Sequence, residues 1–365
     1  MQKLLFFIPN IERGGIEKNL IILSNYFIKR NYEVEIIFGK ISSGVKNNLN
    51  KKINLIKCRK IINTKFIPHR ILNAVNCFIF ILINYKFNNK QIILSFQDHP
   101  FSILISKIKK VPCIIRIANH PYGSLRYYNN KLNFFMKINI KKIFYLFASG
   151  IVCNSKSSTE FFKKYYKNKQ IITIYNPFKK ISVLNKNLKR KNQIVSIGRL
   201  QNQKNFSGLL RAFYLIKNKF KETKLVIMGS GSEHRKLKLI TKELKLTNRV
   251  IFLKYQNPVK IIKVSRLFVL NSLWEGLPNI LIECQNYKTP ILSSDCLSGP
   301  KEILQNGKLG YLTRVNNEKK LAKKIEFILS NYTQALFKAR LATKYLYRFD
   351  EDSQCKKYEN FLKKF

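Results

Sequence analysis

The sequence predicts an α/β protein built from two doubly wound domains with a central cleft between them. Short apolar runs of strand length alternate, in both halves of the chain, with longer segments in which apolar residues recur at helical spacing. A length of 365 residues is enough for two domains with separate cores. The polar segment 179–191 shows neither period and is the expected linker. We therefore expect a first domain over 1–178, a second over 192–345 and a C-terminal segment over 346–365.

The first half opens with strand 3–8, loop 10–15 and helix 16–30, and a second strand follows. This order is that of a βαβ unit, in which a glycine loop lets the backbone approach a phosphate. The loop ends in Gly14-Gly15, but the full GxGxxG fingerprint is absent, so a dinucleotide ligand is not favoured. The pair is also typical of a plain tight turn. Further strands are expected at 34–38, 92–96, 113–117, 150–155 and 171–175.

Three other segments of the first half bear on the class of protein. The longest apolar run, 71–85, contains three asparagines and is too short to cross a bilayer, so we expect a buried helix. Residues 157–160 resemble a capping box and predict that a helix begins there. The apolar residues 4–8 are too few for a signal-peptide core. No targeting segment is therefore expected.

The second half repeats the alternation of strands and helices, as expected for a second doubly wound domain. Several of its strands are followed by polar or glycine-containing loops. The expected strands are 193–197, 224–228, 250–254, 267–270 and 289–293, and the expected helices are 206–218, 233–245 and 280–287.

The chain is strongly basic and contains scattered cysteines. Its formal net charge is +50, and the only acid between positions 36 and 159 is Asp98. Such a surface attracts polyanions, although the abundance of Lys, Asn and Ile also indicates a general composition bias. The 7 cysteines occur singly, without CxxC or His/Cys clusters. Neither a zinc site nor a disulfide framework is indicated, no metal or other cofactor is expected, and single thiols fit a reducing cytosol.

The stretch 274–283 contains the strongest candidate site. Glu275 lies in the loop after strand 267–270, at the edge where open α/β sheets bind ligands. Pro278 suits the first turn of the next helix, and Glu283 lies inside that helix. Helical side chains lean toward the N-terminus, so both carboxylates are expected to face one cleft beside a helix end that attracts phosphate. The stretch predicts a socket for a phosphorylated sugar, although two glutamates at this spacing also occur by chance.

Cations and histidines occur at the same kind of position. Arg199 and Lys204 follow strand 193–197 and precede a helix, so they lie on the same edge as Glu275 and would form a diphosphate site that needs no metal. His99 and His120 follow two strands of the first half, at the edge where catalytic groups lie. A single cation or histidine is more often a surface or structural residue. Of the two histidines we favour His120.

Together these motifs resemble the retaining, nucleotide-sugar-dependent glycosyltransferases of family 4, which have the GT-B fold. The matching pieces occur in the order of the family and extend over nearly the whole chain. In that family a final helix crosses back to the first domain, and here it would be 346–365. The pieces are Gly14-Gly15, Tyr175-Asn176-Pro177, Ile197-Gly198-Arg199-Leu200, Lys204-Asn205, Val226-Ile227-Met228-Gly229-Ser230-Gly231, Glu275-Gly276-Leu277-Pro278, Glu283 and Gly310-Tyr311-Leu312.

The resemblance implies a role for each matching residue. Glu283 would bind the ribose hydroxyls, and Glu275 would hold hydroxyls of the transferred sugar. Arg199 and Lys204 would stabilise the leaving diphosphate, and His120 corresponds to the histidine that the family places near the reacting sugar. The remaining donor-binding positions would be Gly15, Gly198, Gly229, Leu277, Pro278 and Asn279.

The resemblance also implies a reaction. The sugar–phosphate bond ionises, the cations stabilise the diphosphate, and the acceptor attacks from the same face, so that configuration is retained. Segment 293–304 resembles members that use UDP-sugars, often N-acetylhexosamines, in bacterial surface-glycan synthesis. We expect transfer of a hexose or N-acetylhexosamine from a UDP-sugar to a polyprenyl-diphosphate-linked glycan, for a capsule, an O-antigen or a related polysaccharide. GDP-mannose is the alternative donor.

The expected location is cytoplasmic, peripheral on the inner face of the cytoplasmic membrane, with the basic first domain on anionic lipid. Segment 132–147 mixes aromatic residues with lysines, as in an amphipathic helix lying on headgroups or a core-facing helix with a basic outer face. A nucleic-acid-binding protein is an alternative on charge alone, but no RNA- or DNA-binding motif accompanies the charge. A catalytically inactive membrane scaffold is a third alternative, against which the intact pair Glu275 and Glu283 argues.

Overall fold

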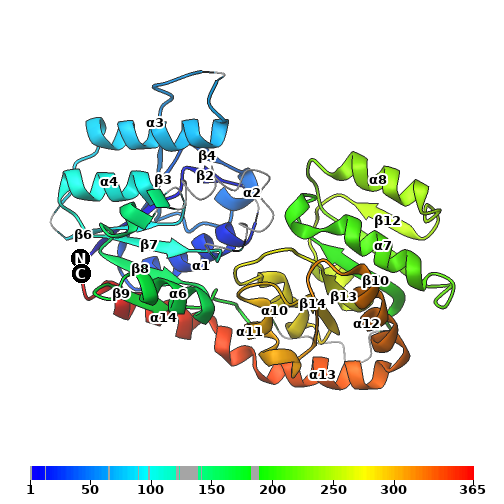
Figure 1. Ribbon diagram of the computed structural model, residues 1–365. Coiled ribbons are helices and arrows are strands. Elements are labelled where there is room, and N and C mark those ends of the chain that lie inside the picture. The colour runs from blue at the N-terminus through cyan, green and yellow to red at the C-terminus, as the bar shows by residue number, and fades with distance from the viewer. Residues whose placement is uncertain are drawn as a thin grey trace. The chain divides into compact units, whose positions relative to one another are not determined.

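The computed structural model separates the chain into two compact units (Figure 1). The first contains 1–118, 129–177 and 351–365, and the second contains 119–128 and 178–350. The structure describes residues 2–12, 14–64, 66–88, 90–97, 99–120, 123, 139–140, 142–181 and 189–365. Half of the predicted amphipathic helix 132–147 and most of the linker 179–191 lie outside these residues. The cleft between the domains stays a prediction.

The first unit is organised on a parallel sheet with the strand order β5-β3-β1-β6-β7-β8-β9. Its central strands read as nearly continuous apolar runs because helices cover both faces of the sheet. Lys3 of β1 pairs with both Glu33 and Gln91, which sets the register of β3, β1 and β6. The strands are β1 (Lys3–Phe7), β3 (Glu33–Phe38), β5 (Asn54–Lys57), β6 (Gln91–Ser95), β7 (Cys113–Ile117), β8 (Gly150–Cys153) and β9 (Gln170–Thr173).

Two cores enclose this sheet, one on each face. On one face the sheet packs against α1 (Gly15–Lys29) and α14 (Glu351–Leu362). On the other it packs against α3 (His69–Asn84), α4 (His99–Lys109) and α6 (Lys156–Tyr165). The C-terminal helix α14 is thus part of the first unit. The remaining elements are β2 (Asn10–Ile11), β4 (Lys40–Ile41) and α2 (Ser43–Lys46).

The second unit contains a parallel sheet with the order β12-β11-β10-β13-β14-β15. Its strands are β10 (Lys191–Ile197), β11 (Lys224–Met228), β12 (Val250–Leu253), β13 (Ser265–Leu270), β14 (Ile291–Ser294) and β15 (Tyr311–Thr313). Its helices are η2 (Asn202–Lys204), α7 (Phe206–Ile216), α8 (His234–Glu243), α9 (Val259–Val264), α10 (Asn279–Asn286), α11 (Pro300–Ile303), η3 (Gln305–Gly307), α12 (Glu318–Ser330), α13 (Tyr332–Lys344) and η4 (Leu346–Phe349).

Two local predictions need correction. The expected capping box at 157–160 lies inside α6, because the helix is capped two residues earlier by Ser155, whose hydroxyl accepts from the Ser158 N–H. The expected buried helix 71–85 is α3, but one side of α3 is exposed, with Ile83 71% accessible. In the part of the chain that the structure describes, no helix combines the length and apolar character needed to cross a membrane.

Candidate active site

The predicted donor-site residues of the second unit gather at the carboxyl edge of its sheet. In the sheet, Ile197 pairs with Met228 at the ends of β10 and β11. Leu270 pairs with Ser293 near the ends of β13 and β14. Parallel strands end on the same edge, so the loops after these strands are neighbours. They are 198–205, 229–233, 271–278 and 295–299, and they contain all of the donor-site positions predicted in this unit except Asn279 and Glu283, which lie in α10.

Glu275 and Lys204 form the electrostatic centre of this edge. The Lys204 ammonium makes a salt bridge with Oε1 of Glu275, although 70 residues separate them in the sequence. The Ser272 hydroxyl donates to the same oxygen at 2.6 Å. Glu275 is 6% exposed, so little water competes with these charge-assisted bonds. The sequence predicted both residues at one edge, and the structure pairs them.

Glycines allow the β10 and β11 loops to meet at van der Waals contact. A Cβ atom on Gly229 would lie 1.9 Å from the carbonyl oxygen of Gly198, so no other residue fits without moving backbone. The aliphatic stem of Lys204 passes over Gly198, with Cε 3.2 Å from the position of a Cβ. Gly198 and Gly229 allow the path of the loop that presents Lys204, and their contact with the donor stays a prediction.

The loop between β13 and α10 is held from two sides. The side-chain amide of Gln203 donates to the Trp274 carbonyl at 2.8 Å. The backbone carbonyl of Gln203 accepts from the Leu273 N–H, also at 2.8 Å. On the other side, a Cβ atom on Gly299 would lie 2.0 Å from the Gly276 carbonyl oxygen, so the start of α11 packs directly on this loop. These contacts fix the segment from Leu277 to Asn279 that the sequence assigns to the donor.

The helix α10 begins at Asn279, one residue before the predicted start, and Pro278 is its N-cap rather than part of its first turn. Its N-terminal end carries the positive end of the helix dipole and lies beside the Glu275 loop. Glu283 occurs in the second turn and is 8% exposed. A glutamate on a helix is usually exposed to solvent, whereas Glu283 is buried near the edge where ligands bind.

The other predicted residues occupy separate positions. Arg199 is exposed and adjacent to Gly198. His120 groups with the second unit, where Asn119 forms an isolated antiparallel bridge with Gly276, and burial lowers the pKa of His120. Its competitor His99 begins α4 in the first unit, where its Nδ1 lies 2.9 Å from the Ser95 hydroxyl.

Gly15 is the first residue of α1 in the first unit, and its carbonyl accepts from Asn19 at 2.9 Å. It follows Gly14 at the end of the first loop, as the sequence predicts. Its proposed approach to the donor phosphates involves both units and stays a prediction.

Several supporting residues escaped the sequence analysis. Ser272 follows β13 directly, Ser294 donates to the Ser272 carbonyl at 2.6 Å, and Cys296 lies close to Glu275. Burial, and then the negative charge of Glu275, raise the pKa of the Cys296 thiol to about 12, so the thiol is protonated at neutral pH. In the sequence, Asn271-Ser272 is recognisable as the end of a buried strand. That position does not show that the Ser272 hydroxyl bonds to Glu275.

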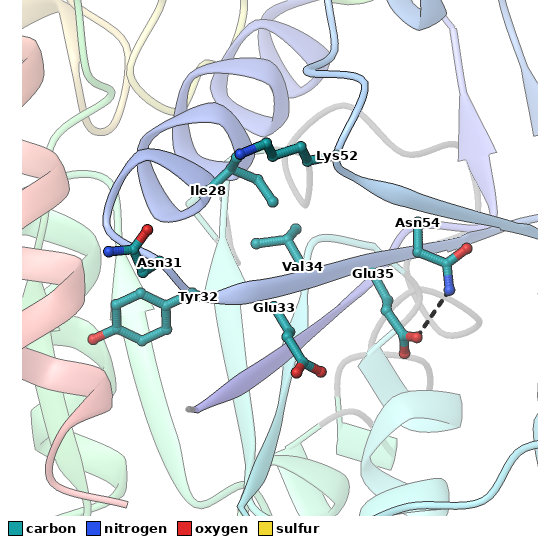
Figure 2. Close-up of a pocket in the computed structure, with 8 residues that line it drawn as sticks. All are labelled: Ile28, Asn31, Tyr32, Glu33, Val34, Glu35, Lys52 and Asn54. Carbon is teal, nitrogen blue, oxygen red and sulfur yellow. Dashed lines mark hydrogen bonds between the residues drawn. The ribbon is translucent and has the colours of Figure 1, made fainter.

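A hollow of about 370 Å³ lies at the opposite, amino edge of the first sheet (Figure 2). Glu33 begins β3 and Asn54 begins β5, and both line it. Glu35 in this hollow accepts from Asn54 and pairs with Lys3, each at 3.0 Å. The hollow is formed by the first unit, whereas Lys204, Glu275 and Glu283 belong to the second. No group of three potential metal ligands occurs among the residues that the structure describes.

Comparison with known proteins shows which proteins this chain is similar to. Residues 178–344 match the family model "Glycosyl transferases group 1". An uncharacterized glycosyltransferase of Methanocaldococcus jannaschii is 33% identical over 55% of this chain and 53% of its own length. A Campylobacter jejuni α-1,4-N-acetyl-D-galactosaminyltransferase, named for an undecaprenol-diphosphate-linked substrate, is 26% identical over 91% of this chain and 90% of its own.

Among solved structures, Anabaena HepE in complex with UDP and glucose superposes with a TM-score of 0.79, covering 100% of both chains at 17% identity. This likeness concerns the fold, which is GT-B. The family match lies over the unit that contains Lys204, Glu275 and Glu283. Over residues 178–344 the chain is therefore similar to the group 1 glycosyltransferases.

Proposed function

We propose that this glycosyltransferase moves a hexose or N-acetylhexosamine from a UDP-sugar to a lipid-linked glycan, with retention of configuration, in bacterial surface-polysaccharide synthesis. The observation that carries the proposal is the buried salt bridge between Lys204 and Glu275 at the carboxyl edge of the second sheet. It places a cation for a diphosphate and a carboxylate for sugar hydroxyls beside the start of α10. The printed names of the Campylobacter and Anabaena proteins support the acceptor and donor classes.

The donor is held by groups of opposite character. Lys204, Arg199 and the N-terminal end of α10 attract the diphosphate, which gains negative charge as the bond to the sugar breaks. Glu283 accepts from the ribose hydroxyls, and Glu275 accepts from hydroxyls of the transferred sugar. Before the donor binds, Glu275 holds the Lys204 ammonium in place, so little reorganisation is needed when the donor arrives.

The reaction is then a displacement with little covalent chemistry by the protein. The bond from the anomeric carbon to the diphosphate oxygen breaks, and positive charge develops on the sugar ring. The acceptor hydroxyl attacks from the same face, and its proton passes to the departing diphosphate. His120 is assigned a place near the reacting sugar, where a lowered pKa keeps it neutral and able to share a hydrogen bond. Nucleotide-sugar is a co-substrate, and the proposal requires no metal or other cofactor.

The acceptor class fixes a location. A polyprenyl-diphosphate-linked glycan is held in a bilayer, and nucleotide-sugars are cytoplasmic, so the enzyme works as a peripheral protein on the inner face of the cytoplasmic membrane. The basic first unit meets anionic lipid there. No specific nucleic-acid partner is part of the proposal.

The donor is identified by incubating the purified protein with a panel of UDP- and GDP-sugars and measuring release of the nucleoside diphosphate, with membrane extract as the source of acceptor. We expect release from a UDP-hexose or UDP-N-acetylhexosamine. Glu275→Gln keeps the shape of the side chain but loses the charge that orients Lys204, and we expect a rate about 100-fold lower. The control, Glu326→Gln, neutralises a surface carboxylate of the same unit that pairs with Lys219.

Three outcomes separate the alternatives. Release from GDP-mannose alone would replace the UDP-sugar by the other donor considered. Equal loss in Glu275→Gln and Glu326→Gln would remove the special role of the buried pair. No release and no binding across the panel would reject the proposed reaction.

A further inference from the structure

The helix α3 exposes an apolar surface that the described residues of the first unit leave open to solvent. No charged side chain occurs from Ile71 to Asn84, so the helix is apolar on the side that faces solvent as well as on the side that faces the core. Ile71 is 49% exposed and Ile83 is 71% exposed. Val75 and Ile79, which are half-buried, lie between them at helical spacing. A helix with an apolar outer face as well as an apolar core face normally has that outer face covered by protein or lipid.

The loop before α3 extends the same surface. Asn76 of α3 accepts from the backbone N–H groups of Ile61 and Ile62 at 2.9 and 2.7 Å, and donates to the Ile62 carbonyl at 3.0 Å. These bonds hold the loop against the helix. Phe66, further along the loop, is 97% exposed. Figure 1 shows α3 beside α4, with the loop before α3 projecting from the side of α3 that faces away from α4. The Phe66 side chain is therefore almost fully accessible to solvent.

Positive charge surrounds these apolar residues. We define the α3 surface by its exposed apolar members, which are Ile61, Ile62, Phe66, Ile67, Ile71 and Ile83. Exposed cations lie before α3, in its first turn, after it, and at the end of α4, and they are Arg59, Lys60, Arg70, Lys86, Lys107 and Lys110. The sequence places no acid between positions 36 and 97. This combination suits an anionic bilayer. The apolar side chains would enter its acyl region, and the cations would pair with its headgroups.

We propose that the α3 surface docks this enzyme on an anionic membrane by inserting Phe66 and the outer isoleucines among the lipids. This inference rests on the proposed function, because a lipid-linked acceptor gives the docking a purpose. RNA would use the cations but leave the isoleucines in water, and a basic protein partner would be repelled. Each cation near the headgroups adds about 1 kcal/mol of attraction, which salt weakens.

The surface is connected to the carboxyl edge of the first sheet. The loop that contains Phe66 follows β5, so it leaves the sheet at that edge. Asn10 of β2 donates to the Arg70 carbonyl at 3.0 Å and accepts from Asn73 of α3 at 2.7 Å. The strand β2 leads directly into the Gly14-Gly15 loop. Docking through α3 would thus bring headgroup-level diphosphates to the edge where parallel sheets bind ligands.

The test uses the full chain and vesicles of phosphatidylcholine with or without phosphatidylglycerol, separated by sedimentation. We expect binding to the anionic vesicles that weakens with salt. Phe66→Ser/Ile83→Ser should lower the partition coefficient at least about tenfold, because two large side chains lose their burial in lipid. The matched control, Phe337→Ser/Leu215→Ser, removes two exposed side chains of the second unit, 67% and 53% accessible, and should bind like the wild type. Equal binding by both double variants would overturn the proposal.

A second measurement reports insertion itself. Tryptophan fluorescence of Phe66→Trp should be quenched by lipids brominated in the acyl chain, and that of Phe337→Trp should not be, after subtraction of the signal from Trp274. Quenching at neither position, or binding to RNA that Phe66→Ser/Ile83→Ser leaves unchanged with no binding to vesicles, would reject the inference.

Donor hydrolysis in buffer distinguishes this inference from the proposed function. The α3 variants should hydrolyse the donor in solution like the wild type and lose only transfer to a membrane-bound acceptor. Vesicle binding that depends on Phe66 and Ile83, in a protein that releases no nucleotide from any donor, would support the α3 surface and reject the proposed reaction. Donor turnover without binding to vesicles would support the proposed reaction and reject the α3 surface as a membrane-docking site.

Discussion

At the scale of single residues, the site depends on a charge pair whose members need each other. The Lys204 and Glu275 side chains are 15% and 8% exposed, so either one without its partner would be a poorly solvated charge. Ser272 supplies one further hydrogen bond to Glu275. Such a pair contributes little net stability compared with apolar replacements, which makes a functional reason for keeping it the stronger interpretation.

Lys204→Met should therefore affect stability and activity together. Loss of the ammonium leaves Glu275 with the Ser272 hydroxyl alone, and we expect the free energy of unfolding to fall by about 2 kcal/mol. The catalysed rate should fall about 100-fold or more, because the diphosphate loses a preorganised cation. Urea unfolding and nucleotide release measure the two effects.

The double variant Lys204→Met/Glu275→Gln separates structure from catalysis. With both charges removed, stability should recover most of the loss, whereas activity should stay as low as in the worse single variant. Recovery of activity along with stability would show that the pair only holds the fold together.

The sequence predicted where these residues lie but not how they pair. The position of a residue after a strand follows from local pattern, so Glu275 and Lys204 were both assigned to one edge. Their salt bridge joins loops of β10 and β13, and the hydroxyl of Ser272 completes it. Contacts of this kind depend on loop conformation, which no single stretch of sequence specifies.

At the scale of elements, the conformation of the β13–α10 loop depends on its neighbours. The start of α11 packs on the Gly276 carbonyl through Gly299, and η2 bonds to the backbone of Trp274 and Leu273 through Gln203. The loop that contains Glu275 therefore has contacts on two sides. We attribute the preorganisation of the site to these braces rather than to the helix α10 alone.

Gly299→Ala tests the brace. Its Cβ would lie 2.0 Å from the Gly276 carbonyl oxygen and 2.7 Å from Leu277 Cα, so the loop must move. We expect KM for the donor to rise about tenfold or more, with a smaller effect on thermal stability. Lys301→Ala on the same short helix removes a side chain that is 56% exposed and should leave KM unchanged. An unchanged KM in Gly299→Ala would show that the loop tolerates displacement.

Strands and helices with a clear apolar period were predicted well. Edge strands and elements of mixed polar and apolar sequence were not. The sequence predicted β13 and α10 because an apolar run is followed by Pro278 at a helix start. It missed β5, an edge strand whose residues are only partly buried, because its mixed sequence Asn-Leu-Ile-Lys has no clear period. It also missed α4, which begins at His99-Pro100, and the two long helices α12 and α13.

At the scale of the whole molecule, the chain returns to its first unit through α14. Arg116 of β7, 1% exposed, donates to Tyr358 of α14 at 3.2 Å and to Asn176 at 2.6 Å, and lies 5.3 Å from the Phe96 ring. One buried guanidinium thus contacts both the segment that leaves the first unit and the helix that comes back. Both of these hydrogen-bond acceptors are neutral, so the charge depends on each of them.

Tyr358→Phe should therefore destabilise the first unit. It removes an acceptor from a buried cation, and we expect a loss of about 1–3 kcal/mol in the free energy of unfolding. Tyr347→Phe, at a side chain 68% exposed in η4, is the control and should change nothing. Equal midpoints in urea for the two variants would contradict the role given to Arg116.

The division into two α/β units could be predicted because strand and helix periods alternate twice along the chain. The excess positive charge was also visible in the sequence, but not the surface on which it acts. The sequence left 132–147 open between a membrane contact and a core-facing helix, and its described part exposes Ile140, Ile143 and Leu146. The described residues expose a further apolar stripe on α3, which the sequence did not single out. An apolar run with few charges fits a buried helix and a lipid-facing one equally, and only the packing of the unit distinguishes them.

The most direct test of the account is a calorimetric titration of UDP into the wild type, Glu283→Gln and Glu326→Gln. The account predicts binding by the wild type and by Glu326→Gln, and an affinity at least about tenfold lower in Glu283→Gln, because a buried carboxylate that accepts from the ribose hydroxyls has lost its charge. Equal affinities for all three proteins would show that the nucleotide does not bind at the α10 edge, and would contradict the assignment of the donor site.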